Sequence, residues 1–465
     1  MVFSSITFLF IFLPLTIILY YILPKFLRNW FLLLISIIFY AWGAPEYLPI
    51  MLAIMLTNYI GALLINKFDK HSQFWLFITI AINITVLIYF KYFDFLIENF
   101  NHIFKSQIPL LNIALPLGIS FYTFQAMSYT IDVFRKIVKP QKNFFKLALY
   151  ISLFPQLIAG PIVKYHEIAE QIDNRKETFE QFYYGIRRFI IGLAKKVLLA
   201  NTLGVIADKV FEQMVLNGVG VGIAWLGAFS RALQLYYDFS GYSDMAIGLG
   251  ALFGFVFIEN FNYPYISKTM NEGWRRWHIS LGTWCKDYIY IPMGGNRVAS
   301  WRIYFNLFFT FLIIGIWHGA SWNFVVFGIW NGLFVILERF TGLAKKEIKG
   351  LWSIPLHLYI IFVWIINAIL VNTDTFKHSI LHVKAMFGIV KPEIVIYALP
   401  YYVETVEVIT IIISVICCIP IFKNILYIKN TTAKFYINIW LLILLLLSVV
   451  KLIAETSNSF IYFRF

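Results

Sequence analysis

The stretch Phe305-Asn-Leu-Phe-Phe-Thr-Phe-Leu-Ile-Ile-Gly-Ile-Trp-His-Gly-Ala-Ser-Trp322 contains one ionisable residue, His318, in a run that is otherwise apolar and uncharged. A run of this composition is expected to lie in a membrane, where an ionisable side chain is costly. Histidine titrates near neutrality, so it can take a proton from a hydroxyl group and return it. His318 is therefore a candidate catalytic base, and a structural histidine that hydrogen-bonds between helices is the alternative.

The composition of the whole chain is that of a membrane protein. Hydrophobic residues make up 60% of the 465 residues and charged residues 13%, and the mean hydropathy is +0.75. Soluble domains contain about 25% charged residues. We predict an all-α polytopic membrane protein with about eleven crossings, together with re-entrant or interfacial helices. The candidate segments are 4–23, 30–45, 47–66, 74–92, 147–163, 183–200, 221–238, 242–258, 303–317, 321–340, 354–372, 404–426 and 435–455.

The positive charges predict how the chain is oriented in the membrane. There are 38 Lys and Arg against 24 Asp and Glu, a net charge of +14. Basic residues gather in the cytoplasmic loops of membrane proteins, so this excess does not call for a nucleic acid as a partner. The first basic residue, Lys25, follows the first apolar run, which predicts an N-terminus outside and no cleaved secretory signal. With no internal repeat or hydrophilic linker, residues 1–465 are predicted to form one membrane domain.

Several common catalytic signatures are absent from the sequence. It contains no phosphate-binding P-loop, no dinucleotide-binding glycine motif after a strand and no zinc-protease His-Glu-x-x-His motif. Nucleotide hydrolysis, Rossmann-type redox chemistry and zinc proteolysis therefore lack their usual residues. The three cysteines, Cys285, Cys417 and Cys418, do not have the spacing of metal ligands, and we predict no metal site.

Residues 265–302 are too charged to span a membrane and too aromatic for an ordinary loop. The basic residues of this segment are Lys268, Arg275, Arg276, Lys286, Arg297 and Arg302. We predict a re-entrant or amphipathic segment on the cytoplasmic side, because irregular backbone is tolerated at membrane depth where it lines a cavity. Since guanidinium groups bind phosphates, Arg275 and Arg276 are candidates for binding a nucleotide-bearing acyl donor, with anionic lipids as the alternative ligand. Trp277 and Trp317 complete this predicted donor site.

Two further polar residues lie in aromatic surroundings. His278 follows Trp277 directly in the charged segment, where a structural role is at least as well supported as a catalytic one. Asn331 follows His318 by thirteen residues, so the two are expected on one helical hairpin. Asn331 is a candidate site residue, with a hydrogen bond between packed helices as the alternative.

An acidic cluster lies upstream, in the stretch Tyr237-Asp-Phe-Ser-Gly-Tyr-Ser-Asp244. Its two carboxylates, Asp238 and Asp244, stand six residues apart beside a predicted span. They either orient a catalytic group or cap a helix that breaks at Gly241.

Motifs in a fixed order cover nearly the whole chain. They are Met1-Val-Phe-Ser-Ser5, Leu115-Pro-Leu-Gly-Ile-Ser-Phe-Tyr-Thr-Phe-Gln125, Phe154-Pro-Gln-Leu-Ile-Ala-Gly-Pro161, Tyr237-Asp-Phe-Ser-Gly-Tyr-Ser-Asp-Met245, Trp274-Arg-Arg-Trp-His-Ile-Ser-Leu281, Tyr290-Ile-Pro-Met-Gly-Gly-Asn-Arg297, Gly315-Ile-Trp-His-Gly319 and Phe460-Ile-Tyr-Phe-Arg-Phe465. Each motif alone is weak evidence. In this order, the set resembles the membrane-bound O-acyltransferase family (MBOAT), and within it the alginate O-acetyltransferase-like bacterial branch.

The resemblance implies a fold and a set of roles. The fold is a ring of tilted transmembrane helices around a central funnel in a bacterial cell membrane, where cytoplasmic acetyl-CoA meets an acceptor reached from outside. The histidine of the Trp-His-Gly motif, His318, is then catalytic. Two departures from the family pattern stand out: Asn331 replaces the histidine of a second Trp-His-Gly, and Gly273 stands where an aromatic residue is usual. If two histidines act, His278 is the remaining candidate.

The last six residues, 460–465, form an aromatic tail that would be costly to leave in water. The tail resembles the Phe-x-Tyr-x-x-Phe ending of this branch, in which a tyrosine is proposed to carry the acyl group. A phenol ionises with a pKa of about 10, so a base activates it more easily than an alkyl alcohol, and its ester remains reactive. Tyr462 is therefore a candidate acyl carrier, with an interfacial aromatic anchor as the alternative.

These features predict an integral membrane O-acyltransferase that moves an acetyl group from acetyl-CoA towards an extracellular or periplasmic polysaccharide. His318 would deprotonate the acceptor hydroxyl and then help the thiolate to leave. The resemblance also implies an SGNH-hydrolase-type partner that makes the final transfer, besides contact with membrane lipids. Alternatives are D-alanylation of teichoic acid from a carrier-protein thioester and a transporter or flippase lined by polar residues. The missing repeat weakens the transporter hypothesis.

Overall fold

The computed structural model describes residues 2–346, 348–390, 392, 397–423, 425–428, 430–455 and 460. Every regular element within these ranges is a helix, so the all-α prediction is confirmed for them. Of the aromatic tail only Phe460 is included, and Tyr462 lies outside the described residues.

Seven helical segments of the described ranges are long and apolar enough to cross a membrane. They are Pro45–Lys67, Asp69–Phe104, Phe179–Leu216, Ser300–His318, Trp322–Phe340, Gly350–Asn372 and Thr431–Ala454. Phe8–Ile22 and Thr405–Cys417 are shorter apolar helices. The prediction of a multi-pass membrane protein is therefore confirmed, whereas the number of crossings and the central funnel remain predictions.

The chain folds into two compact units. The first unit comprises residues 1–189 and 245–258, and the second unit comprises residues 190–244 and 259–465. The helices of the first unit are α1 (Leu13–Ile22), α2 (Lys25–Ala41), α3 (Leu48–Lys67), α4 (Ser72–Leu87), α5 (Phe93–Phe104), α6 (Ile119–Phe134), α7 (Phe144–Ser152), α8 (Phe154–Leu157) and α9 (Tyr165–Asn174). Helices α10 (Phe179–Ala194) and α12 (Val221–Leu252) contribute residues to both units. The prediction of a single membrane domain stays a prediction.

The remaining helices belong to the second unit. They are α11 (Asn201–Leu216), α13 (Met270–Trp274), α14 (Ile279–Cys285), α15 (Ser300–His318), α16 (Trp322–Phe340), α17 (Ile354–Asn372), α18 (Phe376–Met386), α19 (Leu399–Tyr402), α20 (Thr405–Cys417) and α21 (Thr431–Ala454). Single π-helical turns at Phe8–Phe12, Ile88–Tyr92, Lys195–Ala200 and Lys286–Tyr290 interrupt or extend several helices. The predicted segment 265–302 contains only short helices up to Ser300, where α15 begins.

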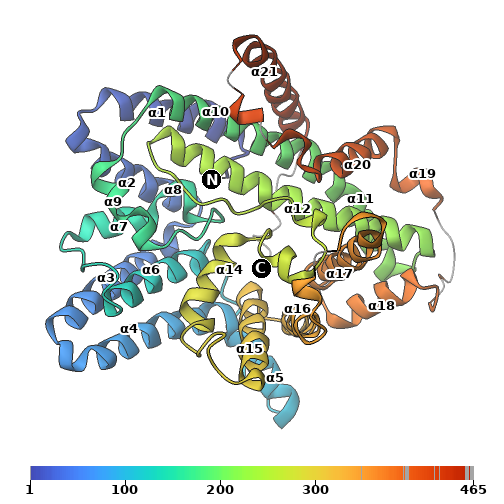
Figure 1. Ribbon diagram of the computed structural model, residues 1–465, viewed down its shortest axis with the longest axis horizontal. Coiled ribbons are helices and arrows are strands. Elements are labelled where there is room, and N and C mark those ends of the chain that lie inside the picture. The colour runs from blue at the N-terminus through green and yellow to red at the C-terminus, as the bar shows by residue number, and fades with distance from the viewer. Residues whose placement is uncertain are drawn as a thin grey trace. The chain divides into compact units, whose positions relative to one another are not determined.

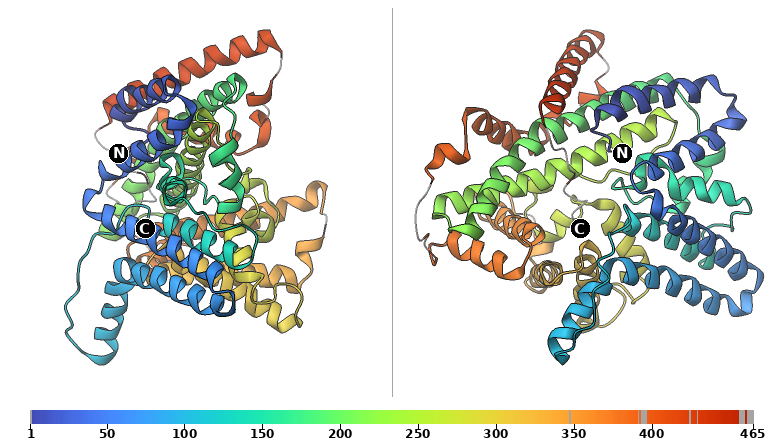
Figure 2. Two further views of the ribbon diagram at one scale, coloured as in Figure 1. Left: turned by 90° about the vertical axis from the view of Figure 1, so that its left-hand side faces the viewer. Right: turned by 180° about the vertical axis from the view of Figure 1, so that it is seen from behind.

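In the first unit, α3, α4 and α6 lie side by side (Figures 1 and 2). Their contact is polar as well as apolar, because the buried amides of Asn58 and Asn83 donate to each other over 3.0 and 3.3 Å. The hydroxyl of Thr130 donates to Asn58 over 2.8 Å. Gly61 lets α4 approach, since a Cβ there would lie 2.2 Å from Oγ1 of Thr79. Close packing around small residues and amide pairs is typical of helices in lipid.

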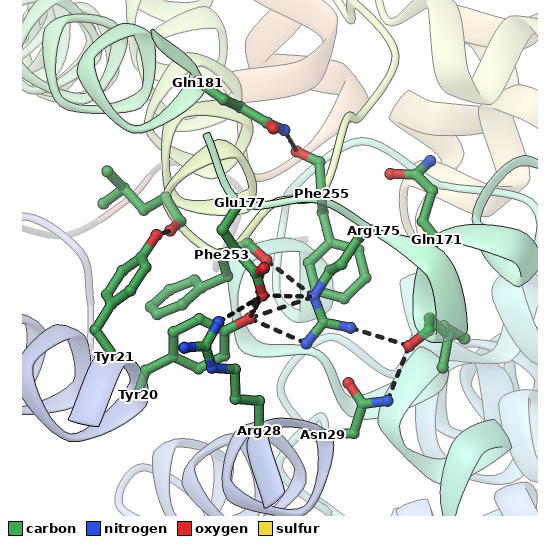
Figure 3. A network of polar contacts seen from close by, with 12 residues as sticks. Tyr20, Tyr21, Arg28, Asn29, Gln171, Arg175, Glu177, Gln181, Phe253 and Phe255 are labelled. Atoms are coloured by element: carbon green, nitrogen blue, oxygen red, sulfur yellow. Dashed lines mark hydrogen bonds and ion pairs between the residues drawn. The ribbon is translucent and has the colours of Figure 1, made fainter. Parts of the chain in front are cut away.

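A second polar network ties the ends of several elements of the first unit together (Figure 3). The carboxylate of Glu177 accepts a hydrogen bond from Tyr20 of α1 over 2.7 Å and forms an ion pair with Arg28 of α2 over 3.1 Å. Arg175, directly after α9, donates to the carbonyl of Phe253 over 3.0 Å. The network therefore fixes the segment that follows α12 against α1, α2 and the end of α9.

Helix α12 corrects one prediction. Residues 221–238 and 242–258 are not two separate spans, because α12 runs without a break from Val221 to Leu252, through Gly241. A Cβ on Gly241 would lie 2.7 Å from the carbonyl oxygen of Gly192 in α10. The glycine therefore allows two helices to pack closely and does not interrupt one.

The predicted span 147–163 is also wrong, since α7 ends at Ser152 and only the short α8 follows.

Candidate active site

His318 is the last residue of α15, and it is buried. The chain turns at Gly319 and enters α16, with which α15 forms a tightly packed hairpin. A Cβ on Gly319 would lie 2.1 Å from the ring of Phe324, so a side chain at this position has no room. The imidazole of His318 packs edge-on against Phe327, with the ring centroids 5.5 Å apart. The Trp-His-Gly motif therefore places the imidazole at a close-packed helix end.

His278 lies beside His318, with the two ring centroids 6.2 Å apart. It is fully buried at the N-terminal end of α14, and its backbone is left-handed, with φ at 44°. Trp317 contacts the same ring at 5.8 Å. Burial lowers the pKa of His278 well below its usual value, which favours the neutral ring that can accept a proton. The structure thus brings both histidines of the sequence analysis together.

Phe460 carries the start of the tail into this site. Its side chain is 2% exposed and packs on Tyr242 of α12, with the ring centroids 4.7 Å apart. It also contacts Phe239, one turn earlier on α12, at 6.4 Å. Phe239 in turn packs edge-on against His278 at 4.7 Å. The described end of the chain is therefore one aromatic ring away from the histidine pair.

Asn331 is fully engaged in hydrogen bonds between elements. Its amide nitrogen donates to the carbonyl of Phe327 over 2.7 Å and to Asn367 of α17 over 2.9 Å. Its amide oxygen accepts from Asn367 over 3.0 Å and from the indole of Trp274 over 3.2 Å. Asn331 therefore joins α16, α17 and α13 one turn away from the Phe327 ring that touches His318.

The four residues of the predicted donor site have different surroundings. Arg276 forms an ion pair with Glu272 over 2.9 Å, whereas Arg275 is exposed. Trp277 and Trp317 are buried in the aromatic cluster around the histidines. Of the two arginines, Arg275 is the more exposed.

Comparisons with known proteins identify the family. The probable alginate O-acetylase AlgI of Pseudomonas aeruginosa is 42% identical over 377 residues, which cover 79% of this chain and 72% of that protein. The model of the membrane-bound O-acyltransferase family matches residues 135–346. The chain belongs to this family. The peptidoglycan O-acetyltransferase of Helicobacter pylori is 36% identical over 382 residues, 75% of this chain and 72% of that protein. The teichoic acid D-alanyltransferase of Bacillus subtilis is 26% identical over 270 residues, 55% of this chain and 67% of that protein.

Family membership confirms the resemblance found in the sequence and makes this MBOAT protein an acyltransferase. It also sets aside the transporter hypothesis. Among the described residues, no group of three or more His, Cys, Asp or Glu side chains is placed to hold a metal ion.

Sequence reasoning missed two lysines of this MBOAT chain. Lys196 forms a buried ion pair with Asp238 over 2.5 Å, and Lys195 forms a half-buried ion pair with Asp244 over 2.6 Å. Both lysines lie in the π-helical turn after α10, and π-helical turns are frequent at functional sites. Two adjacent lysines within the predicted span 183–200 were the signal, since a charge in a span needs a partner.

The structure also explains the missing aromatic residue at Gly273. A Cβ there would lie 3.2 Å from the ring of Trp364, which α17 contributes. Trp364 packs between Trp274, at 5.6 Å, and Trp277, at 4.9 Å. An aromatic side chain is thus present at this place in the MBOAT chain, but it comes from another helix.

Proposed function

We propose that this acyltransferase O-acetylates an extracellular or periplasmic polysaccharide with acetyl groups from cytoplasmic acetyl-CoA. Two of the relatives named above support this proposal, since one is a probable alginate O-acetylase and another a peptidoglycan O-acetyltransferase. Amino-acyl transfer is a second candidate function, because the D-alanyltransferase of Bacillus subtilis is also similar to this chain. Its sequence identity of 26% is lower than that of the two O-acetyltransferase relatives.

The observation that carries the mechanism is the position of Phe460 against Phe239, whose ring contacts His278 of the histidine pair. Two residues of extended chain span about 7 Å, and the proposal requires Tyr462 to reach the site over this length of chain. In the proposed step, His318 takes the proton of the Tyr462 phenol and the phenolate attacks the thioester carbonyl. The carbon–sulfur bond breaks, the acetyl ester forms on the tyrosine, and the CoA thiolate takes the proton back from the imidazolium.

The remaining site residues would support this step. The ring centroid of His278 lies 6.2 Å from that of His318. His278 would accept or relay the second proton of the cycle, when the acetyl group leaves Tyr462. Arg275 and Arg276 would bind the donor's phosphates, with Trp277 and Trp317 lining the path of its acyl end. The contacts of Asn331 favour a role in orienting α16 over one in proton transfer.

A separate SGNH-hydrolase-type partner would make the final transfer from Tyr462 to the glycan. This arrangement fits a bacterial cytoplasmic membrane with the chain's N-terminus outside. Both statements rest on the family's architecture and on the distribution of basic residues.

Intact-mass spectrometry of the purified protein with acetyl-CoA tests the proposal. The expected result is a gain of one acetyl group that maps to the tail and is lost in both His318→Ala and Tyr462→Phe. The second variant keeps nearly all of the packing and removes only the hydroxyl. An adduct of equal yield in Tyr462→Phe would disprove the tyrosine relay, and failure of the wild type to release any CoA with an acceptor present would disprove the choice of donor.

A further inference from the structure

The backbone of His278 is in a conformation that L-residues rarely adopt. Its φ of 44° lies in the left-handed region, which is uncommon for residues other than glycine, although histidine, asparagine and aspartate adopt it more often than other side chains. Such a conformation persists only where the surrounding contacts hold it in place. The contacts on either side of His278 therefore decide where its imidazole lies.

Asn260 makes the contacts on the C-terminal side. Its backbone carbonyl accepts a hydrogen bond from the N–H of Ile279 over 3.0 Å. Its side-chain oxygen accepts from the N–H of Ser280 over 3.2 Å and from the Ser280 hydroxyl over 2.9 Å. One fully buried residue thus holds the first two residues of α14, directly after His278.

Asn262 makes the contacts on the N-terminal side, and all of them use its backbone. Its N–H donates to the carbonyl of Arg276 over 2.9 Å, and its carbonyl accepts from the Arg276 guanidinium over 3.1 Å. Residues 260–262 therefore run alongside residues 276–280 and clamp the Trp277-His278 turn from both sides.

The clamp is anchored on α12. The amide nitrogen of Asn260 donates to the hydroxyl of Ser243 over 3.0 Å. Ser243 follows Tyr242, on which Phe460 packs, and Phe239 of the same helix contacts the ring of His278. The side chain of Asn260 thus ties the His278 turn to the helix on which Phe460 also packs.

From this geometry we infer that Asn260 is a positioning residue of the acyl-transfer site. It holds His278 in the left-handed turn, so that the imidazole faces His318. The inference rests on the proposed function. Truncation of Asn260 to alanine leaves the buried N–H and hydroxyl of Ser280 without their acceptor, and the turn can then relax towards an ordinary conformation and carry the ring away from His318.

A double-mutant cycle on the full-length protein tests the inference. Misplacement of a reacting group by about 1 Å can cost about 100-fold in rate, so Asn260→Ala should lower kcat for acetyl transfer by about that factor, with KM for acetyl-CoA unchanged. If Asn260 acts through His278, the double variant Asn260→Ala/His278→Ala should be no slower than His278→Ala alone. A purely structural residue would lower the rate in both backgrounds.

Asn262→Ala is the matched control, since the bonds of Asn262 run through its backbone and should keep the wild-type kcat. Asn260→Asp keeps the acceptor for Ser280 but loses the amide donor to Ser243, so it should be faster than Asn260→Ala and slower than the wild type. Equal rates in Asn260→Ala and wild type, equal losses in Asn260→Ala and Asn262→Ala, or further loss in the double variant would overturn the inference.

Three further outcomes are decisive. If Asn260→Ala does not fold, Ser243→Ala decides, because it removes only the anchor: a lower kcat supports the inference and an unchanged kcat overturns it. If His278→Ala transfers acetyl groups at the wild-type rate, the role proposed for His278 fails, and the positioning role of Asn260 fails with it. If His278→Ala is impaired while Asn260→Ala is not, only the positioning role fails.

Discussion

At the scale of single residues, different backbone conformations position the two imidazoles. His318 ends a helix and is followed by Gly319, whereas His278 precedes a helix in a left-handed turn. In both places, contacts of the neighbouring residues restrict the conformation of the backbone. Small changes beside the histidines should therefore have effects as large as changes to the histidines themselves.

Gly319→Ala tests this sensitivity. The new Cβ would overlap the ring of Phe324, which packs beside His318, so the ring must move. Overpacking of this kind costs about 1–3 kcal/mol of stability, and we expect a lower thermal midpoint together with loss of acetyl transfer. Gly222→Ala is the matched control, because nothing lies within 4 Å of its Cβ position. A fully active Gly319→Ala would show that the close contact does not position His318.

His166, at the start of α9, predicts a pH dependence of stability. Its Nδ1 lies 2.7 Å from the buried carboxylate of Asp132, and this hydrogen bond raises the pKa of His166 above its usual value. A raised folded-state pKa means that the stabilisation is fully present below the unfolded pKa of about 6.5 and is lost as the pH rises through the folded value. His166→Ala should therefore lower the thermal midpoint more at about pH 5.5 than at about pH 8.5. The same loss at both pH values would contradict this assignment.

At the scale of elements, α12 makes aromatic contacts and ion pairs with several other segments of the second unit. Its Phe239 and Tyr242 contact His278 and Phe460, and its Asp238 pairs with the π-helical turn after α10. Because α12 continues through Gly241 without a break, these side chains keep helical spacing and face defined neighbours. The charges on α12 are thus part of its packing and are not caps at a helix end.

The buried pair Lys196–Asp238 tests the importance of that packing. Its side chains are 4% and 1% exposed, so Lys196→Met leaves the carboxylate without this cation. Breaking a buried pair costs about 3–5 kcal/mol, whereas replacing both partners by apolar residues is often neutral. We expect Lys196→Met to unfold at a clearly lower temperature and Lys196→Met/Asp238→Leu to recover most of the loss. A double variant no more stable than the single one would argue that the pair has a role beyond charge neutralisation.

At the scale of the whole molecule, each unit is held together by contacts between segments that are far apart in the sequence. In the first unit, the Glu177 network joins α1, α2 and the residues after α12 (Figure 3). In the second unit, the C-terminal segment returns through Phe460 to α12 and the histidine pair. The proposed relay depends on this second return, because it brings Phe460, the first residue of the tail, close to His278.

Phe460→Ala should therefore impair self-acetylation more than stability. Loss of the ring frees the tail from α12, and the effective concentration of the tyrosine at the site falls; a decrease of about tenfold or more in the rate of acetyl transfer to the protein is expected. Mass spectrometry over time measures this rate. Phe460→Leu keeps an apolar contact and should retain most of it. An unchanged rate in Phe460→Ala would mean that the tail reaches the site without this anchor.

The sequence alone determined the membrane class, the all-α fold and the family, and it singled out His318, His278 and the tail. The membrane class, the all-α fold and the family are confirmed because transfer free energies and local motifs act along the chain, whereas the roles of His318, His278 and the tail remain predictions. His318 stood out because a lone ionisable group in an apolar run is expensive.

Only the tertiary structure decided which residues meet. It placed the ring of His278 beside that of His318. It also showed the ion pairs of Asp238 and Asp244 with two lysines and the hydrogen bonds between Asn331 and Asn367. It also showed that Gly241 sits within a continuous helix and that Trp364 fills the space beside Gly273. The physical reason is that such contacts join residues far apart in sequence, and packing rather than local periodicity selects them.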